Sequence, residues 1–380
     1  MEWQKRALLA LSQALEGIEG DESWEYAMEK AYFQNRWFEK DEVLRSLHQW
    51  KESLSPENIA NFLNIYPWST IPHLQHLDGN GSINPANSND YSHTGNSPVN
   101  EDDLPVLGLI LAGNIPLVGL QDVINGVLCG YKVKAKRSSD DEVLISHLLD
   151  KAAQFNPIWS NRVLWSDDLK NIHAAIATGS NNSSKHFEYY FRNIPHIIRK
   201  NRNSVIWVSG DETEDEILGY GHDVFDYFGL GCRNVTSLLL PKNYEISTIF
   251  HVWDKHFQEL VHHNKYANNY TYHKALLLMN LDPHIDTGYV IAKENPQIYA
   301  PVGMMHYQFF DKDDAVIDFL LANKENIQVV VCKQDARVSQ LDNLGITAVK
   351  PGDTQCTTLT DFADNIDTID WLLKLRLSEK

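Results

Sequence analysis

From residue 104 onward, short apolar runs alternate with stretches of helical spacing, and this alternation limits the fold more than any other feature. The first apolar run is 106–112, and the stretch 117–128 that follows has the spacing of an amphipathic helix. Further strand-like runs lie at 131–136, 162–165, 174–178 and 204–208. Strands that alternate with helices form right-handed βαβ units and a parallel sheet. The sequence therefore predicts an α/β protein with ligands at the carboxyl ends of its strands.

The alternation does not cover the whole chain, and the remainder suggests its division. Residues 1–77 have helical spacing and predict a helical N-terminal region. Residues 78–102 are rich in Asn, Ser and Gly, which is typical of a flexible loop. We expect a nucleotide-binding domain at 103–212 and a catalytic domain at 213–350. We expect 351–380 to return to the core as a C-terminal helix.

Beyond residue 232 the alternation continues and predicts a second α/β unit. The pattern indicates a helix over 246–263 and strands at 276–279 and 289–291. A helix at 315–322 and a buried strand that ends at Cys332 follow.

The composition indicates a globular protein of a reducing compartment. The chain is 43% hydrophobic and has no run of about 18 apolar residues, so we expect no transmembrane helix. Its first residues start an amphipathic helix and do not resemble a signal peptide. Four cysteines without paired spacing fit a cytoplasmic location. The net charge of −18 argues against nucleic acid as a partner.

One cysteine stands on a glycine-rich turn, Phe228-Gly229-Leu230-Gly231-Cys232-Arg233-Asn234. Glycines accept positive φ values and allow such a turn to expose the sulfur. The cation of Arg233 should lower the pKa of the neighbouring thiol. Free cysteines are usually small buried apolar side chains, a description that Cys129, Cys332 and Cys356 fit better. Cys232 is therefore the candidate nucleophile.

Polar residues follow three of the predicted strands. Asn114 follows the first, where an amide can donate to a developing oxyanion or simply cap a helix. The second ends in Lys136-Arg137-Ser138-Ser139, which suits a phosphate or a ribose but equally a solvated charge run. The fourth ends in Gly179-Ser180, which suits a pyrophosphate or an ordinary turn. No GxGxxG fingerprint follows any strand.

A metal site and a serine nucleophile are not expected. His251, His256, His262 and His263 fall on a predicted surface helix without the supporting groups of a metal site. The sequence contains no HExxH, no CxxC pair and no GxSxG elbow, so it does not indicate a serine hydrolase.

The order of these residues, an Asn, a Lys, a Gly-Ser and then a Cys, resembles that of the aldehyde dehydrogenase superfamily. More closely, the chain resembles the LuxC-type long-chain fatty acyl-CoA reductases. The matching stretches are 112–119, 227–234, 265–270 (Lys-Tyr-Ala-Asn-Asn-Tyr) and 361–368. The resemblance implies a Rossmann-like nucleotide-binding domain, a second α/β catalytic domain and a helical N-terminal region.

The resemblance also implies roles for single residues. Cys232 matches the nucleophile and Asn114 the amide of the oxyanion hole. Lys136 matches the lysine that contacts the adenine ribose, and Gly179 and Ser180 match the turn under the cofactor pyrophosphate.

Two departures from the superfamily pattern bear on the chemistry. Ser139 replaces a glutamate that grips the ribose in many NAD-using members, and Arg137 is available to a 2′-phosphate, so we expect NADPH as the cofactor. The stretch 199–203 lacks the carboxylate that activates water in the hydrolytic members. An acyl-enzyme would then await hydride or another thiol.

The implied activity is the NADPH-dependent reduction of a fatty acyl-CoA to a fatty aldehyde through an S-acyl-Cys232 intermediate. The acyl donor is a fatty acyl-CoA or an acyl-protein, and an acyl-activating protein partner is left open. The superfamily suggests a homo-oligomer. Two alternatives remain: an acyltransferase or thioesterase-like protein that forms the acyl-cysteine without hydride transfer, and a non-catalytic scaffold for an acyl-activating partner.

Overall fold

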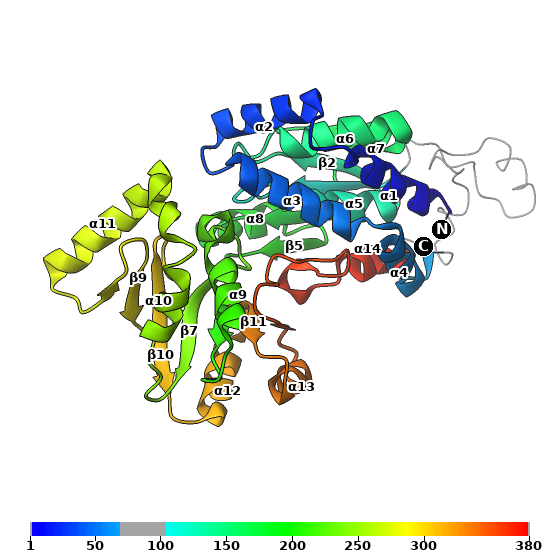
Figure 1. Ribbon diagram of the computed structural model, residues 1–380. Helices are drawn as coiled ribbons and strands as arrows, with labels where there is room; N and C mark the ends of the chain where they lie inside the picture. The colour runs from blue at the N-terminus through cyan, green and yellow to red at the C-terminus, as the bar shows by residue number, and fades with distance from the viewer. Residues whose placement is uncertain (1, 69–103, 379–380) are drawn as a thin grey trace, which may run out of the picture. The chain divides into compact units, whose positions relative to one another are not determined.

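Two mainly parallel sheets, one in each of two units of the chain, account for the strand–helix alternation (Figure 1). The computed structural model describes residues 2–68 and 104–378. Unit 1 comprises Met1–Lys200 and Thr358–Lys380, and unit 2 is Asn201–Thr357. The loop expected at 78–102 lies outside the described residues.

Five parallel strands form the sheet of unit 1, in the order β3-β2-β1-β4-β5. Their bounds are β1 Val106–Ile110, β2 Lys132–Lys136, β3 Val163–Trp165, β4 Ala174–Thr178 and β5 His196–Arg199. The chain runs outward from β1 to β3 and then returns to the other side of β1 with β4. Such a reversal of strand order is the place where doubly wound sheets bind their ligands.

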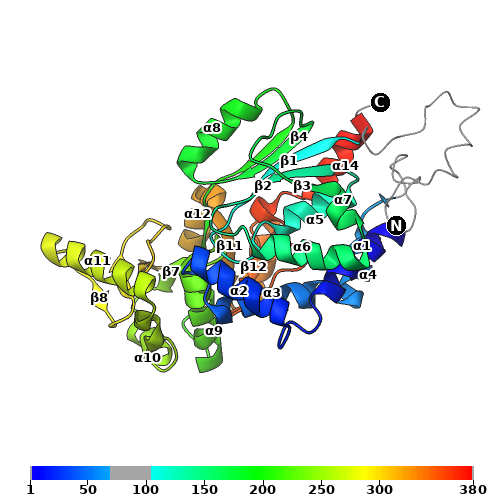
Figure 2. The same ribbon diagram turned by 90° about the horizontal axis from the view of Figure 1, so that it is seen from above.

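Helices cover both faces of this sheet (Figure 2). α5 (Leu120–Leu128) and α6 (Leu144–Phe155) pack on one face, where Leu107 and Leu109 of β1 join their core. α8 (Asn181–Phe191) lies on the other face, against Ala175 and Ala177 of β4. The short helix α7 (Ile158–Arg162) leads into β3.

Within residues 2–68 the N-terminal region is helical, as predicted. Its helices are α1 Glu2–Ala14, α2 Glu22–Gln34, α3 Lys40–Ser53 and α4 Pro56–Ile65. They share one apolar core with α5, α6 and the C-terminal helix α14 (Thr368–Ser378), so both ends of the described chain belong to unit 1. Within residues 2–68 and 104–378, no helix has the length and apolar character needed to cross a membrane.

The sheet of unit 2 has seven strands in the order β12-β11-β6-β7-β10-β9-β8. All neighbours are parallel except β8 and β9. The bounds are β6 Asn203–Trp207, β7 Val235–Pro241, β8 Ile285–Asp286, β9 Ile291–Glu294, β10 Met304–Phe310, β11 Ile327–Cys332 and β12 Ala348–Val349. β6, which falls before the expected domain boundary at 212, pairs within this second sheet.

The faces of this sheet are also covered by helices. α9 (Glu214–Phe225) and α10 (Ser247–Trp253) share a core with one face, and α12 (Asp313–Ala322) and α13 (Ala336–Asn343) share a core with the other. α11 (Asn264–Asn280) packs on β9 and β10 through Tyr270 and Leu277 (Figure 1).

Two predictions for unit 2 are wrong. The helix expected over 246–263 is α10 followed by the 3-10 helix Gln258–His262. The strand expected at 276–279 is part of α11, where Leu276, Leu278 and Met279 are exposed. An apolar run of four residues fits a strand or a helix, and only the longer helical spacing of Tyr266, Tyr270 and Leu277 distinguishes them.

Candidate functional site

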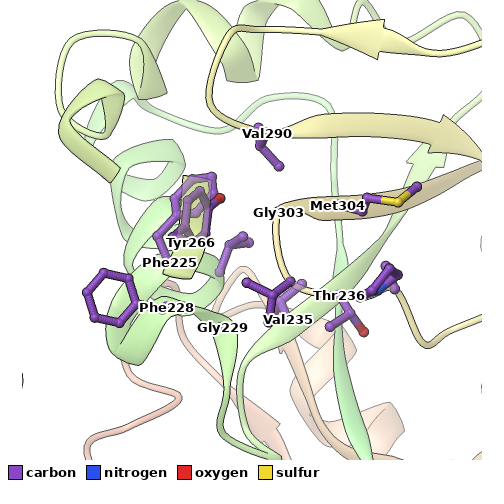
Figure 3. Close-up of a pocket in the computed structure, with 13 residues that line it drawn as sticks. Phe225, Phe228, Gly229, Val235, Thr236, Tyr266, Val290, Gly303 and Met304 are labelled. Carbon is purple, nitrogen blue, oxygen red and sulfur yellow. The ribbon is translucent and has the colours of Figure 1, made fainter. Parts of the chain in front are cut away.

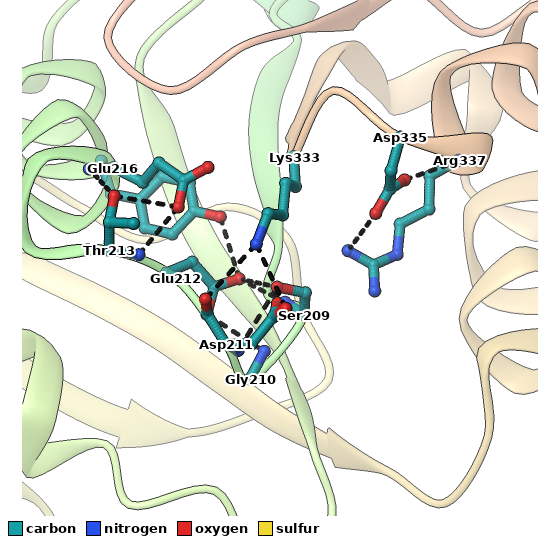
Figure 4. Close-up of polar contacts among 10 residues, drawn as sticks. Ser209, Gly210, Asp211, Glu212, Thr213, Glu216, Lys333, Asp335 and Arg337 are labelled. Atoms are coloured by element: carbon teal, nitrogen blue, oxygen red, sulfur yellow. Dashed lines mark hydrogen bonds and ion pairs between the residues drawn. The ribbon is translucent and has the colours of Figure 1, made fainter.

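The loop between β6 and α9 fixes the start of the helix that leads to Cys232 (Figure 4). The Glu212 carboxylate accepts the Ser209 hydroxyl at 2.7 Å and the Gly210 N–H at 3.0 Å. Thr213 and Glu216 then form a capping box, in which each side chain accepts the backbone N–H of the other. The capping box satisfies the N–H groups of Thr213 and Glu216 at the start of α9.

At the end of α9 the chain reverses through three consecutive residues in the left-handed region. Their φ values are 53° for Tyr227, 57° for Phe228 and 74° for Gly229. Glycine adopts this conformation freely, whereas it costs about 1–2 kcal/mol at each of the two aromatic residues. Burial of both rings offsets that cost, and the ring of Phe228 stacks on His263 with centroids 4.2 Å apart.

Asn234 closes the turn that carries Cys232. Its side chain is fully buried, and its Oδ1 accepts the backbone N–H of Gly231 at 2.8 Å. Its Nδ2 donates to the carbonyl oxygens of Asp226 at 2.8 Å and Asp223 at 3.1 Å. One amide thus ties both arms of the turn to the end of α9, which holds the intervening Cys232 in a fixed backbone.

A second set of bonds ties the turn to the segment that follows β12. Arg233 is buried, and its Nη1 lies 3.4 Å from the carbonyl oxygen of Thr354. The Asp223 carboxylate, also buried, accepts the N–H groups of Gly352 at 2.8 Å and Thr354 at 3.0 Å. Burial raises the pKa of Asp223 to about 6. Arg233 therefore has a structural partner, and its expected effect on the Cys232 thiol stays a prediction.

Cys232 differs from the other cysteines in its surroundings. It is half-buried, whereas Cys129 and Cys332 are buried and Cys356 is exposed. The expectation that Cys356 is a buried apolar side chain is therefore wrong. Burial raises the pKa of Cys332 to about 12 and that of Cys129 well above its usual value, so neither is a ready thiolate.

In unit 1 the candidate cofactor residues meet at one edge of the sheet. Ile110 of β1 is in register with Lys136 of β2 and with Ala177 of β4. The chain leaves these three neighbouring strands at the same, carboxyl edge, where Asn114 and the Gly179-Ser180 turn follow. The structure thus brings together the polar residues that the sequence placed after separate strands.

The Asn114 loop is held by the connection that follows β2. The buried Asp141 carboxylate accepts the N–H groups of Leu117 at 2.8 Å and Leu144 at 3.3 Å. Leu117 has a φ of 60°, so its conformation depends on this support. Gly113 lies against Ser138 of this connection, because a Cβ at Gly113 would come within 2.5 Å of Ser138 Oγ.

Asn114 itself is exposed and is not the cap of α5. The residue at that N-cap position is Gly119, five residues further along the chain. The alternative interpretation of Asn114 as a simple helix cap is therefore wrong.

The cations after β2 have different surroundings. Lys136 is exposed at the strand end, and Ser139 is exposed beyond it. Arg137 lies over the ring of Trp165, 5.3 Å from its centroid, and its Nη1 donates to Ser146 Oγ at 3.1 Å and to the Glu142 carbonyl at 3.3 Å. These contacts hold the guanidinium beside the sheet edge.

The Gly179-Ser180 turn opens α8. Ser180 is the N-cap, and its hydroxyl accepts the Ser183 N–H at 3.2 Å. A Cβ at Gly179 would lie 2.8 Å from the Phe187 ring, so only glycine allows this close packing of strand end and helix. The first N–H groups of α8 therefore start directly at the sheet edge, as a pyrophosphate requires.

The stretch that lacks a carboxylate base begins with an inward-facing arginine. Arg199 is buried and pairs with Asp122 through two bonds of 2.5 and 3.0 Å. It also donates to Thr368 Oγ1 at 3.1 Å. Arg199 thus serves the core of unit 1.

Among the described residues, no three His, Cys, Asp or Glu side chains come together in a way that could hold a metal ion. The four histidines of 251–263 are spread over α10, a turn and the 3-10 helix, and His263 caps α11.

Sequence reasoning missed Asn234, Asp223 and Asp141, which hold the two loops in place. Asn234 belongs to the glycine-rich turn that carries Cys232, and an amide beside two glycines is a signal of side-chain to backbone bonding in a turn.

Comparisons with known proteins identify the fold. No protein-family model and no curated protein sequence matches this chain. Among solved structures, aldehyde dehydrogenase KauB from Pseudomonas aeruginosa has a TM-score of 0.62 at 10% identity, over 97% of this chain and 82% of that one. The NAD+ complex of an aldehyde dehydrogenase from Bacillus cereus has a TM-score of 0.59 at 12% identity, over 92% and 76%.

A Mycobacterium tuberculosis aldehyde dehydrogenase complexed with NAD+ has a TM-score of 0.58 at 12% identity, over 92% of this chain and 77% of that one. At such identities the likeness is one of fold. Together with the two parallel sheets and the helical N-terminus, it confirms the predicted fold class: the chain has an aldehyde-dehydrogenase-like fold with a Rossmann-like unit.

Proposed function

We propose that this chain is an NADPH-dependent reductase of the LuxC type, which converts a fatty acyl-CoA to a fatty aldehyde through an S-acyl-Cys232 intermediate. The observation that carries the proposal is the turn at Cys232. Three hydrogen bonds of the Asn234 side chain hold a turn that has two left-handed aromatic residues and a half-buried thiol. Strain of this kind persists mainly where function requires it.

The residues at the sheet edge of unit 1 fit a nicotinamide dinucleotide. Lys136 is available to the adenine ribose, and Gly179 brings the N–H groups of α8 to the strand ends for the pyrophosphate. Two of the solved structures with this fold hold NAD+. Ser139 in place of a carboxylate, with Arg137 held beside it, favours NADPH. When bound, the reduced nicotinamide supplies a hydride to the acyl carbon.

The chain's own residues carry the remaining chemistry. The Cys232 thiolate attacks the thioester carbonyl, the bond from that carbon to the CoA sulfur breaks, and CoA leaves as a thiolate that takes up a proton. The Asn114 amide and the Cys232 N–H hold the oxygen while it carries negative charge. After reduction, the hydroxyl of the thiohemiacetal loses its proton to solvent and the carbon–sulfur bond breaks, which releases the aldehyde and returns the Cys232 thiolate.

The stretch 199–203 explains why water does not intervene. No carboxylate stands there, and the side chain of Arg199 is committed to Asp122. Without the carboxylate that the hydrolytic members have at this stretch, water is poorly activated, and we expect hydride transfer to outrun hydrolysis of the acyl-enzyme.

The acyl donor, the protein partner, the location and the assembly are proposed from the same resemblance. We propose that the acyl donor is a fatty acyl-CoA or an acyl-protein, with an acyl-activating protein as the partner in the second case. A cytoplasmic location and a homo-oligomeric assembly belong to the same proposal.

Acyl labelling tests the proposal without cofactor. Radiolabelled palmitoyl-CoA should label the wild type on Cys232, and the label should be released by hydroxylamine. Cys232→Ala should remain unlabelled, whereas the matched control Cys356→Ser should label as the wild type does. Equal labelling of the wild type and Cys232→Ala contradicts Cys232 as the nucleophile, and no labelling of either contradicts a fatty acyl-CoA as the acyl donor. A label that NADPH does not release as aldehyde favours the acyltransferase alternative.

A further inference from the structure

A cavity in unit 2 is lined by residues that precede and follow Cys232 in the chain, although Cys232 itself is not a lining residue (Figure 3). Phe228 and Gly229 precede Cys232, Val235 and Thr236 follow it, and all four line the cavity. The rest of the wall consists of Val224, Phe225, Tyr266, Val290 and the turn 300–304.

None of the lining residues is charged. The Thr236 hydroxyl is already used, since it donates to the Ile298 carbonyl at 2.8 Å. Tyr266 is 2% exposed, and burial raises the pKa of its hydroxyl, so it stays neutral. A wall without charged side chains does not favour an ionic ligand, and its apolar side chains can contact an alkyl group.

The position of Tyr266 also suggests what the motif at 265–270 does. This run begins α11, and Tyr266 enters the cavity from that helix (Figure 3). Tyr270, one turn later, lies against Gly303, where a Cβ would come within 2.9 Å of the Tyr270 Cα. The motif therefore forms one wall of the cavity and sets the position of the opposite turn.

The cavity is narrow, with about 20 Å³ of free interior, which is room for about one water molecule. An alkyl chain requires side chains to move aside. Met304 is suited to this, because its unbranched side chain adapts to irregular space and it is only partly buried.

We propose that this cavity takes up the alkyl chain of the acyl group carried by Cys232, and that Val290 and Met304 limit the length it accepts. The inference rests on the proposed function, which places the acyl group on Cys232. It deepens that function by assigning the surface that selects among acyl chains.

Alkylation of the thiol tests the cavity without acyl-CoA or NADPH. N-methyl-, N-butyl- and N-octylmaleimide differ only in alkyl length, and the reaction rate at Cys232 is read by peptide mass spectrometry in a Cys356→Ser background. In this background the rate should rise with alkyl length, by about fourfold for each methylene that becomes buried. Val290→Phe should remove the gain for N-octylmaleimide and leave the N-methylmaleimide rate within about twofold. Met304→Ala should increase the gain.

A buried substitution away from the cavity is the matched control. Val316→Phe adds the same volume in the core beneath α12 and should lower stability without changing the chain-length profile. If Val290→Phe does not fold, the chain-length profile of Met304→Ala still tests the proposal, since this substitution removes atoms rather than adding them. A profile that is flat in the background protein, or identical in Met304→Ala, overturns the proposal. If the rate rises steeply with alkyl length but palmitoyl-CoA does not label the protein, the cavity binds alkyl groups and the proposed function is rejected.

Discussion

Asn234 Oδ1 accepts the backbone N–H of Gly231 at 2.8 Å, and the two residues between them include Cys232. The same side chain donates to two carbonyl oxygens at the end of α9. A single buried amide therefore fixes where the thiol stands, and its loss should affect the chemistry as well as the fold.

Asn234→Ala leaves a buried N–H and two carbonyl oxygens without this partner, so we expect the free energy of unfolding to fall by about 3 kcal/mol. A displaced nucleophile should lower kcat by about 100-fold. The KM for NADPH should not change, because the proposed cofactor residues lie in unit 1. Urea unfolding and steady-state kinetics measure these quantities. Asn343→Ala, at the exposed end of α13, is the control and should resemble the wild type. Wild-type kcat in Asn234→Ala would contradict the assigned role.

Asp141 should make stability depend on pH. Burial raises its pKa to about 7, so its contribution is full below about pH 4, where the folded and unfolded chains are both protonated. As the pH rises from about 4 to about 7, the unfolded chain ionises first and up to about 4 kcal/mol is lost. The unfolding free energy of the wild type relative to Asp141→Asn should therefore fall over this range. The exposed neighbour gives the control, Asp140→Asn, which should follow the wild type. A difference that stays constant with pH would show that Asp141 does not titrate there.

Asp122→Ala should destabilise the protein through Arg199. Removing the carboxylate leaves a buried guanidinium without its main partner, which costs about 3–5 kcal/mol. Asp370→Ala breaks the exposed pair with Lys374 and should cost less than about 1 kcal/mol. Thermal unfolding of both variants gives the comparison, and equal losses would argue against a buried pair.

Four of the five strands of unit 1, β1 to β4, could be predicted because each is a short strand-like run between polar turns. The fifth, β5, was not predicted, since only its two central residues are apolar. The carboxyl ends of the four predicted strands then followed from the parallel order, so the sequence alone was enough to place Asn114, Lys136 and Gly179 at one edge. The helix α11 could not be predicted in the same way, since Leu276 to Met279 are apolar at every position and carry no period of their own.

The contacts that hold the loops could not be predicted either. Asp141 has the sequence context of an acidic helix start, but its carboxylate serves Leu117, 24 residues earlier in the chain. Asp223 has the sequence context of an ordinary polar residue of α9, but its carboxylate accepts the N–H groups of Gly352 and Thr354. Such pairs depend on the tertiary fold, which local propensity does not encode.

Arg137→Ala tests the cofactor preference. If the guanidinium pairs with a 2′-phosphate, its loss should raise the KM for NADPH about tenfold and leave that for NADH nearly unchanged. Arg36→Ala removes another exposed guanidinium that lies on an aromatic ring, here Tyr32, and should change neither value. A proportional rise of both KM values would reject a role for Arg137 in phosphate recognition.

The central claim is that Cys232 carries an acyl group to its reduction. Its most direct test follows NADPH oxidation by absorbance with acyl-CoAs of increasing chain length, together with the aldehyde formed. The account predicts one aldehyde for each NADPH consumed, and no consumption by Cys232→Ala. Acyl-CoA reduction that persists in Cys232→Ala would contradict it.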